Sequence, residues 1–546
     1  MGGDVAVRAD FDAPVQRPRG GAAAVFHRAP AAGPGSFVSH LSPDFRRPAS
    51  GNDQNPAQPD RTKAADDTIA AGRAAMARHA AAARRTLHTA VTRVETVDAS
   101  FSARRTFTAP QVAAFIIAIG AVAAALAFWP LATVLGLELC AATFFFAVGF
   151  IRYFAATTIR HRALPRLPRR IRAPPVYTVL VPLRDEAHMI RQIVAALDGL
   201  RWPRDRLDIK LVIDADDHAT LAAARAVATA APYEVIEVPP GGPRTKPMAL
   251  QYALCFARGA LVTVYDAEDR PHPLQLVEAY VAFCEAGPDL ACLQAPLVID
   301  NSGRSKLAAL FAIEYSALFD GLLPALVKLR LPLPLGGTSN HFRRAALEAV
   351  GAWDPYNVTE DADLGIRLTR FGFRTGTLTL PTLEEAPERL GPWLRQRTRW
   401  QKGWLQTWLV HMRHPLRLRR QIGMRQLAGF NALGLGMIVS MLAHPLFLAT
   451  PVIILLDPGR FWGHGPGVAA LAGIAVFNLA FGYATMAMLA ARALVLRRRA
   501  ALAPFIWLLP LYWLLMGLAS LLALGELLFR PHRWNKTPHL GGRRTP

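Results

Sequence analysis

The sequence predicts an α/β domain inserted between membrane-length apolar segments, and three observations lead to this class. First, 52% of the 546 residues are hydrophobic and mean hydropathy is +0.21, which is high for a wholly soluble protein. Second, apolar runs close to the roughly 20 residues that span a bilayer lie on both sides of a central region. Third, short β-rich runs alternate with helical patterns in that region, which indicates βαβ units and a parallel sheet.

The charge balance narrows the classes of function. The chain has 62 Lys and Arg against 40 Asp and Glu, which gives a net charge of +22. This surplus excludes an acidic, solvating chain and leaves nucleic acid, anionic lipid headgroups or an anionic substrate as partners. No helix-turn-helix or base-stacking sheet motif is present, so we expect no nucleic-acid partner. The four Cys have no C-x-x-C spacing, which argues against a zinc site or a disulfide framework.

The first 110 residues form an N-terminal region of biased composition. Residues 1–65 are rich in Ala, Pro, Gly, Arg and Asp and have no apolar period, so they are predicted to be disordered. No apolar stretch follows Met1, so we expect no cleavable signal peptide. Residues 66–95 are Ala- and Arg-rich and favour a helix, which either lies on anionic lipid or remains solvated.

Residues 111–155 are predicted to form a transmembrane hairpin. Two apolar runs, Gln111–Trp129 and Leu131–Ile151, are hinged at Pro130. Arg residues flank the pair on both sides, which places both of its ends in the cytoplasm.

The C-terminal part of the chain is also predicted to lie in the membrane. Residues 413–428 are typical of an interfacial helix, and residues 530–546 are a short basic tail. Between them, residues 429–529 form a transmembrane region with three apolar stretches, at Gly429–Leu456, Gly467–Leu496 and Ala501–Phe529.

Residues 170–412 have the composition of an α/β domain. The predicted strands are Tyr177–Val181, Ile209–Ile213, Val235–Val238 and Leu261–Tyr265. The first, second and fourth of them run directly into polar clusters. Because ligands bind at the carboxyl ends of parallel strands, these clusters are the first indication of a functional site.

Three carboxylates follow the fourth predicted strand, at Asp266, Glu268 and Asp269. Carboxylates gathered there repel one another and raise each other's pKa unless a cation compensates. Mg²⁺ and Mn²⁺ prefer oxygen ligands and typically share their sites with phosphates, so they fit this pattern. The alternative is an acidic loop that caps the next helix.

A second acidic group, Glu360 and Asp361, follows Thr359 and opens an amphipathic helix. Such a pair is either ordinary helix capping or a general base directed into a site. Spacing alone leaves both interpretations open.

A third cluster contains Gln396, Arg399 and Trp400. In a helix these side chains fall on one face, which combines a phosphate-pairing guanidinium with an aromatic surface for a sugar ring. The alternative is an interfacial helix with Arg and Trp anchors.

In this order, the three motifs resemble those of a known family. A soluble α/β insert with D-x-D-like, T-E-D and Q-x-x-R-W motifs between membrane spans is similar to the inverting family 2 glycosyltransferases. Within that family it is most similar to the processive membrane synthases of cellulose, hyaluronan, chitin and curdlan. The resemblance covers Thr178 to Trp404 and the membrane plan, and it implies a GT-A, Rossmann-like fold for the catalytic domain.

The resemblance also implies roles for the motif residues. Asp361 matches the catalytic base, with Glu360 beside it. The loop Gly336–Asn340 resembles the one beside the acceptor sugar. Those that match nucleotide-sugar positions are Pro182, Glu186, Asp214, Asp216, Lys246 and Asp266. Those that match the site of Mg²⁺ or Mn²⁺ are Asp266, Glu268 and Asp269. Those that match the motif for the diphosphate and the acceptor are Gln396, Arg399 and Trp400.

The implied activity is that of a UDP-sugar-dependent hexosyltransferase. By resemblance, the protein is expected to polymerise a β-linked polysaccharide and to translocate it; the alternative is a non-processive transferase that acts on a membrane lipid. The expected partners are a UDP-sugar donor, a growing glycan or lipid acceptor, the lipid bilayer, and regulatory or export proteins. The expected location is a bacterial-type inner membrane, crossed several times, with the catalytic domain in the cytoplasm.

The number of predicted spans and the charge of the basic tail, residues 530–546, predict opposite sides of the membrane for it. Three C-terminal spans place it outside, whereas its Arg and Lys residues favour the cytoplasm. The segment Trp534–His539 resembles short Trp- and Thr-containing segments near the active site of related synthases. We therefore expect a cytoplasmic tail that closes over UDP, with the last apolar stretch broken near Pro504 and Pro510. The alternative is a basic anchor at a membrane exit.

Overall fold

The computed structural model describes residues 80–534 except 161–164, 169–170, 458 and 460–464. The predicted disorder of residues 1–65 and the end of the basic tail, including Lys536, lie outside the described residues. The described residues from Thr86 onward belong to one structural unit.

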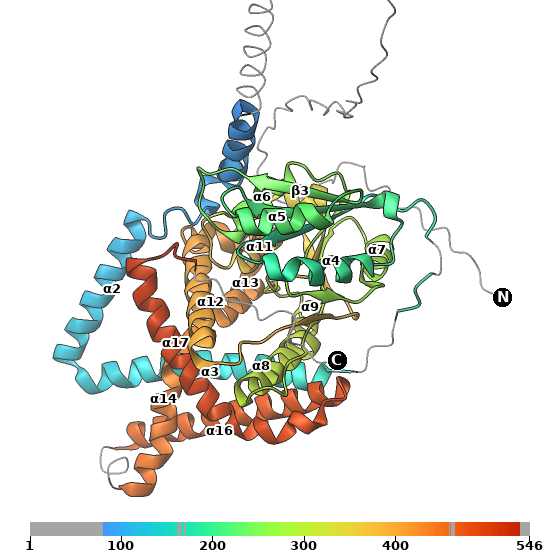
Figure 1. Cartoon of the computed structure of the whole chain (residues 1–546). Helices are drawn as coiled ribbons and strands as arrows, with labels where there is room; N and C mark the ends of the chain where they lie inside the picture. The colour runs from blue at the N-terminus through green and yellow to red at the C-terminus, as the bar shows by residue number, and fades with distance from the viewer. Residues whose placement is uncertain (1–79, 161–164, 169–170, 458, 460–464, 535–546) are drawn as a thin grey trace, which may run out of the picture. The chain divides into compact units, whose positions relative to one another are not determined.

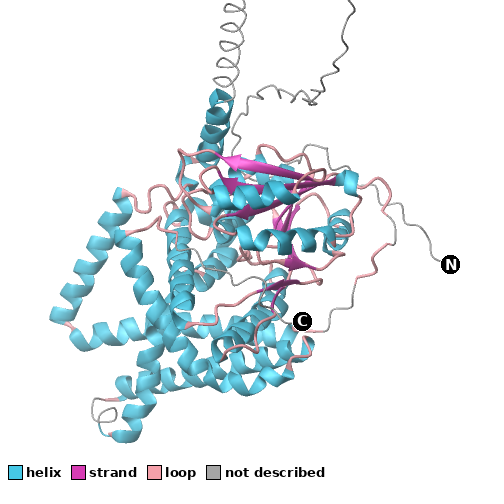
Figure 2. Cartoon of the chain, viewed as in Figure 1, coloured by secondary structure: helices cyan, strands magenta, loops and turns pink. Residues whose placement is uncertain are grey.

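A seven-stranded sheet forms the centre of the α/β domain (Figures 1 and 2), with the order β3-β2-β1-β4-β8-β6-β9. The four predicted strands are present as β1 to β4, and they run parallel. β8 runs antiparallel to both of its neighbours, β4 and β6, so the sheet is mixed rather than wholly parallel as predicted. The strands are β1 (Tyr177–Leu183), β2 (Leu207–Asp214), β3 (Tyr233–Val238), β4 (Leu261–Val264), β6 (Leu290–Gln294), β8 (Asn340–Arg343) and β9 (Arg374–Thr377).

The antiparallel direction of β8 places its first residues beside the end of β4. Thr263 lies opposite His341, and Leu261 lies opposite Arg343. The chain therefore enters β8 from the carboxyl edge of the parallel strands. As a consequence, the loop that precedes β8 lies at the edge where ligands bind.

Helices cover both faces of this sheet. Successive residues of β1 belong to two different cores, with Val179 in one and Leu180 in the other, as expected for a strand buried on both sides. The domain helices are α4 (Ile190–Asp198), α5 (His218–Val227), α6 (Lys246–Leu254), α7 (Gln275–Glu285), α10 (Arg344–Ala349), α11 (Glu360–Arg370) and α12 (Leu390–His411).

A second, three-stranded sheet has the order β5-β10-β7. β10 (Thr382–Glu384) pairs antiparallel with β5 (Arg270–Pro271) and parallel with β7 (Leu297–Ile299). This sheet connects the acidic turn after β4 to the segment that leads into α12.

Six described segments are long and apolar enough to cross a membrane. Five of them cover the predicted apolar stretches. The sixth, Lys306–Lys328, was not predicted as a span, and 72% of its apolar window is buried within the structure. The membrane-length elements are α2 (Ala109–Phe128), α3 (Pro130–Thr158), α8 (Lys306–Ser316) with η4 (Ala317–Leu322) and α9 (Leu323–Lys328), α13 (Pro415–Leu433) with α14 (Leu435–Leu456), α16 (Pro466–Leu496), and η5 (Ala500–Leu508) with α17 (Leu509–Phe529).

The last apolar stretch is interrupted near the two predicted prolines. A 3₁₀ helix, η5, contains Pro504 and ends at Leu508, and α17 begins at Leu509 with Pro510 in its first turn. Proline lacks the N–H that a continuing α-helix requires, but it fits the first turn of a new one.

From Thr86 onward, the helix that ends at Val97 packs on the catalytic domain. Its side chains Leu87, Ala90 and Val94 are buried, and Arg93 donates a hydrogen bond to the sulfur of Cys255 at 3.1 Å. The sequence predicted a lipid-bound or a solvated helix over residues 66–95 and did not predict this contact with the domain. Burial of one apolar stripe against the domain explains why it is ordered.

Candidate active site

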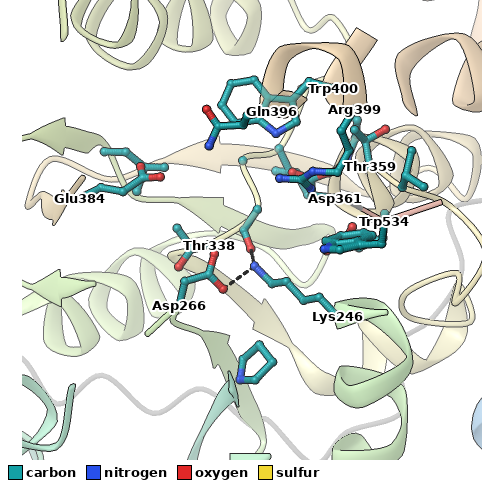
Figure 3. Close-up of a pocket in the computed structure, with 18 of the residues that line it drawn as sticks. Lys246, Asp266, Thr338, Thr359, Asp361, Glu384, Gln396, Arg399, Trp400 and Trp534 are labelled. Carbon is teal, nitrogen blue, oxygen red and sulfur yellow. Dashed lines mark hydrogen bonds and ion pairs between the residues drawn. The ribbon is translucent and has the colours of Figure 1, made fainter. Parts of the chain in front are cut away.

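A cavity of about 470 Å³ lies at the carboxyl ends of β1, β2 and β4 (Figure 3). Pro182 of β1, Asp214 of β2 and Asp266, just after β4, line it. All the predicted site residues line this cavity except Asp216 and Asp269. The fold thus brings together motifs that are far apart in the sequence.

The turns after β1 and β2 form one end of the cavity. Arg184 Nε lies 3.7 Å from Asp214 Oδ2. Burial raises the pKa of Asp214, and Arg184 opposes this change. Asp216 lies in a smaller neighbouring cavity, where its carboxylate is 2.5 Å from Arg244. Two arginines thus flank the acidic positions assigned to the nucleotide.

The start of α5 holds the turn that follows β1. Asp217 caps α5 and accepts a hydrogen bond from the backbone N–H of Asp185 at 2.6 Å. The backbone N–H of Glu186, a buried residue, donates to the Thr220 hydroxyl at 3.0 Å. These contacts fix the backbone that presents Glu186 to the cavity.

Lys246 is the first residue of α6, and Thr245 caps this helix. Lys246 Nζ lies 2.5 Å from Asp266 Oδ1 and donates a hydrogen bond to the carbonyl oxygen of Gly337 at 2.6 Å. Burial lowers the pKa of Lys246, but the negative charges of Asp266 and Glu360 outweigh that effect, so the pKa is raised. A protonated Lys246 therefore ties the end of β4 to the loop before β8.

The acidic turn after β4 divides into residues that face the cavity and one that does not. Asp266 and Glu268 line the cavity. Asp269 is fully buried, where its Oδ2 accepts hydrogen bonds from the Asp266 backbone N–H at 2.7 Å and from the Thr338 hydroxyl. Burial, followed by repulsion from Asp266, raises the pKa of Glu268 and Asp269 well above the usual range.

This donor set has the chemistry of a divalent-cation site. Asp266 and Glu268 offer only oxygen ligands, and their surroundings favour a compensating positive charge. Within the described ranges, no group of three His, Cys, Asp or Glu side chains could by itself hold a metal ion. Asp266 and Glu268 therefore fit a cation whose coordination is completed by substrate phosphates, as is common for Mg²⁺. A direct role for Asp269 stays a prediction.

Glu360 and Asp361 are the first two residues of α11, and both line the cavity. Burial raises the pKa of Glu360 to about 8, and repulsion from Asp361 adds to the rise. Burial also raises the pKa of Asp361, but Lys246 and Arg399 oppose this rise. The charge of Asp361 thus raises the pKa of Glu360, whereas the two neighbouring cations favour the charged form of Asp361.

The face of α12 that carries Gln396, Arg399 and Trp400 lines the cavity, as the helical spacing predicts. Trp400 stacks against Tyr315, with ring centroids 6.4 Å apart and planes at 24°. The guanidinium carbon of Arg399 lies 4.6 Å from the centre of the Trp534 ring. An aromatic surface and a cation thus lie beside the acidic pair, as Figure 3 shows.

The described start of the tail is attached to the same helix. Lys402 Nζ lies 2.8 Å from Glu526 Oε2 and donates to the carbonyl oxygens of Arg530 at 3.3 Å and Arg533 at 2.9 Å. Trp534 lines the cavity. The end of α17 therefore returns the chain to the catalytic domain, next to the predicted site.

Several cavity residues were not predicted from the sequence: Glu314 and Tyr315 on α8, and Glu384 on β10. Burial, followed by repulsion from Asp269, raises the pKa of Glu384 well above the usual range. No motif marks these three residues. The one available signal was the mean hydropathy of 1.5 for the segment Lys306–Lys328, which contains the first two.

The cavity becomes apolar at its end nearest the membrane-length segments. The lining residues there come from three such segments, Lys306–Lys328, Pro415–Leu456 and Ala500–Phe529. They are Leu318, Leu322, Leu433, Met437 and Met516. The site therefore connects the polar edge of the sheet with helices of membrane length.

The comparisons with known proteins agree with this geometry. Residues 174–403 match the family described as "Glycosyltransferase like family 2". The centre of the chain therefore resembles a family 2 glycosyltransferase domain, and the α/β fold, GT-A-like and flanked by membrane-length helices, is as predicted.

Three relatives are similar over nearly half of the chain. The probable glycosyltransferase YdaM of Bacillus subtilis is 27% identical over 44% of this chain and 58% of its own length. The beta-monoglucosyldiacylglycerol synthase of Synechocystis sp. is 29% identical over 44% of this chain and 50% of its own. The cellulose synthase 1 catalytic subunit of Komagataeibacter xylinus is 27% identical over 48% of this chain and 35% of its own length. The chain spans about half the length of these relatives.

Among solved structures, the mannosyltransferase PcManGT of Pyrobaculum calidifontis, in complex with GDP-Man and Mn²⁺, aligns with a TM-score of 0.47 at 19% identity. The alignment covers 72% of this chain and 99% of that one.

Proposed function

We propose that this protein is an inverting membrane glycosyltransferase that extends a β-linked polysaccharide from a UDP-sugar. One observation carries the proposal: Lys246, Asp266, Asp361 and Arg399, from separate parts of the chain, meet in a single cavity that ends among membrane-length helices. The similarity to a cellulose synthase subunit named as UDP-forming supports the choice of UDP and of a polymer.

The chemistry assigns a role to each group. Asp361 accepts the proton of the acceptor hydroxyl while its oxygen forms a bond to the anomeric carbon. The bond from that carbon to the diphosphate breaks in the same step, which inverts the centre. Arg399 and Lys246 stabilise the charge that develops on the diphosphate. A divalent ion held by Asp266 and Glu268 would add positive charge at the same group.

The basic residues around the first two membrane-length helices support a cytoplasmic catalytic domain. Arg104 and Arg105 precede α2, and Arg160 follows α3. Positively charged flanks favour the cytoplasmic side. We therefore assign the domain to the cytoplasmic face of a bacterial-type inner membrane.

A lipid acceptor is the second candidate, and one specific observation favours it. The membrane end of the cavity is lined by Leu and Met side chains rather than by groups that hydrogen-bond to sugars. An acyl or prenyl chain would bury apolar surface there, which contributes about 25 cal/mol per Å². The similarity to a glucosyldiacylglycerol synthase points in the same direction.

One experiment tests the function and separates the two acceptors. Membranes that contain the protein are incubated with UDP-[¹⁴C]glucose or UDP-[¹⁴C]N-acetylglucosamine, and the Asp361→Asn variant serves as the control. Label in ethanol-insoluble material indicates polymer, whereas label in the chloroform–methanol phase indicates a glycolipid. Absence of both products with a panel of UDP-sugars would contradict the proposal.

The variant Leu322→Gln sharpens the distinction, because it places an amide at the apolar end of the cavity. It should suppress glycolipid formation far more than polymer formation, since an amide buried against a hydrocarbon chain has no hydrogen-bond partner.

A further inference from the structure

Arg397, which lies within the Gln396–Trp400 motif but was assigned no role, is the centre of a buried polar cluster. Its guanidinium donates two hydrogen bonds to Glu314, at 2.8 Å to Oε1 and 2.6 Å to Oε2. It also donates to the Tyr512 hydroxyl at 3.0 Å. Tyr512 in turn donates to Glu314 Oε2 at 2.7 Å and accepts from Trp393 Nε1 at 3.2 Å. The cluster links α8, α12 and α17.

Aromatic rings surround the same guanidinium. Its central carbon lies 4.4 Å from the centre of the Phe311 ring and 4.6 Å from that of Trp400. Arg397 is 3% exposed. A planar guanidinium can use its edge for a bidentate carboxylate pair and its faces for aromatic rings at the same time. Lysine has neither the fork nor the flat faces, so it could not replace this arrangement.

The contact with Trp400 connects the cluster to the site. Trp400 lines the cavity and stacks on Tyr315, which follows Glu314 on α8. Arg397 therefore packs against the Trp400 ring. Glu314 in turn hydrogen-bonds to Arg397, and it lies on α8, the helix that also carries Tyr315, the stacking partner of Trp400. A change in this cluster would tilt or release the aromatic surface without touching Lys246 or Asp361.

Helix α17 reaches α12 at two points on either side of this motif. Tyr512, near its start, contacts Trp393 and Arg397, and Glu526, near its end, pairs with Lys402. The two helices lie side by side between these points (Figure 1). A membrane-length helix thus braces the segment that carries Gln396, Arg399 and Trp400.

We propose that Arg397 is a positioning residue that orients Trp400 for the acceptor, and that Tyr512 on α17 sets the position of Arg397. The inference rests on the proposed function in one respect, namely that Trp400 contacts the acceptor. It assigns to a membrane-length helix a direct influence on how the acceptor is held. Donor binding uses Arg399 of the same helix, but the side chains of the cluster itself, Glu314, Arg397 and Tyr512, are assigned no contact to the donor.

The test uses the full-length protein in membranes and UDP-[¹⁴C]glucose or UDP-[¹⁴C]N-acetylglucosamine, whichever the wild type transfers. Two products are counted: sugar transferred to the acceptor, and free sugar released by water. Tyr512→Phe removes one hydroxyl and should lower the transfer-to-hydrolysis ratio about fivefold, because Arg397 and Glu314 lose a shared hydrogen-bond partner. Arg397→Lys should lower it at least about tenfold. UDP affinity, measured by calorimetry, should stay within about twofold for both variants, because no contact to the donor is removed.

Coupling between variants distinguishes positioning from general damage. Tyr512 acts through Arg397 and then Trp400, so Tyr512→Phe should have no further effect in the Arg397→Lys or the Trp400→Ala background. Tyr483→Phe is the matched control, because Tyr483 lies on α16 and its hydroxyl hydrogen-bonds to His444 at 2.6 Å rather than to Arg397, Glu314 or Trp393. This control should leave the ratio unchanged.

The outcomes separate the two proposals. If the wild type transfers no label, the proposed function fails and this inference with it. If the wild type transfers label but Tyr512→Phe leaves the ratio unchanged, acts additively with Arg397→Lys, or behaves like Tyr483→Phe, the positioning role alone is wrong. The single-oxygen change in Tyr512→Phe keeps the test valid even where Arg397→Lys does not fold.

Discussion

Arg399 and Trp534 are separated by more than a hundred residues, yet the guanidinium carbon lies 4.6 Å from the centre of the indole ring in the wall of the cavity. Lys402, less than one helical turn from Arg399, binds the backbone carbonyls of Arg530 and Arg533. The basic tail thus begins at the site, and its first aromatic residue covers the cation assigned to the diphosphate.

The first prediction concerns this contact. Trp534→Ala should weaken UDP binding by roughly 5- to 30-fold, because a cation–π contact that is partly shielded from water contributes about 1–2 kcal/mol. Calorimetric titration with UDP measures the change. Trp507→Ala is the matched control, because the Trp507 side chain is 85% exposed and lies in η5; equal weakening in both variants would contradict a specific role for Trp534.

The second prediction concerns the side of the membrane on which the tail lies. A single cysteine at Thr545, in a background without the four native cysteines, should react with an impermeant maleimide only after lysis. Labelling in intact cells would place the tail outside and end the idea that it closes over UDP. If the tail is cytoplasmic, Lys536→Ala should also impair turnover, whereas a simple anchor would leave turnover intact.

The third prediction concerns the acidic pair. Asp361→Asn should reduce transfer by about 10²- to 10⁴-fold, the usual contribution of a general base, while UDP binding remains. Glu360→Gln should retain at least about ten times more activity than Asp361→Asn, because a pKa of about 8 keeps Glu360 protonated near neutral pH. Near-wild-type turnover of Asp361→Asn would refute the assignment.

The pH profile provides a further check on this pair. Asp361 must be deprotonated to act as the base. Because burial raises its pKa, activity should fall on acidification at a higher pH than it would with an ordinary aspartate. With a pKa of about 8, Glu360 is already neutral on the acid side of neutrality, so Glu360→Gln should leave this acid limb in place. A limb that moves to lower pH would show instead that Glu360 is charged in that range and repels Asp361.

The fourth prediction concerns the divalent ion. Asp266→Ala should abolish both Mn²⁺ binding in the presence of UDP, detected by electron paramagnetic resonance, and transfer activity. Asp216→Ala is the control, because Asp216 lies outside the main cavity, and it should keep Mn²⁺ binding. Full activity in EDTA would argue against a metal at this site altogether.

The fifth prediction compares two glycines near Asp361. A Cβ at Gly337 would lie 3.6 Å from both Asp361 Oδ2 and Lys246 Nζ, an ordinary contact, but it would enter the reacting space. Gly337→Ala should therefore keep thermal stability within about 1 kcal/mol and lower transfer at least about tenfold.

A Cβ at Gly403 would instead overlap the Thr359 side chain. Gly403→Ala should destabilise the fold by about 1–3 kcal/mol, because overpacking shifts the start of α11. Thermal denaturation and the transfer assay measure the two effects. The interpretation is wrong if Gly337→Ala loses stability while Gly403→Ala does not.

Much of the architecture follows from local sequence pattern. The runs that became β1, β2 and β4 are mostly β-branched or apolar, and burial on both faces requires no alternation. The membrane-length segments are equally local, because bilayer thickness sets their length. Even the interruption of the last segment could be anticipated, since Pro504 and Pro510 disrupt a continuous helix wherever they occur.

Other features depended on how distant segments pack. The direction of β8 followed from where the chain re-enters the sheet, which no local pattern encodes. Lys306–Lys328 has the apolarity of a span, yet it supplies Glu314 and Tyr315 to the cavity because it is largely buried against other elements. The helix predicted over residues 66–95 was assigned to lipid or water, because nothing in its sequence reveals the domain surface that receives Leu87.

The sequence by itself determined which side chains could do the chemistry: Lys246, Asp266, Asp361, Arg399 and Trp400 have functional groups and motif spacings that are local properties. Their meeting in one cavity depends on the tertiary structure, as do the hydrogen bonds that hold Asp269 behind it, the place of Trp534 in its wall and the contact of Tyr512 with Arg397. The physical reason is that a cavity is made by surfaces from separate elements, and their approach depends on packing across the whole domain rather than on any single segment.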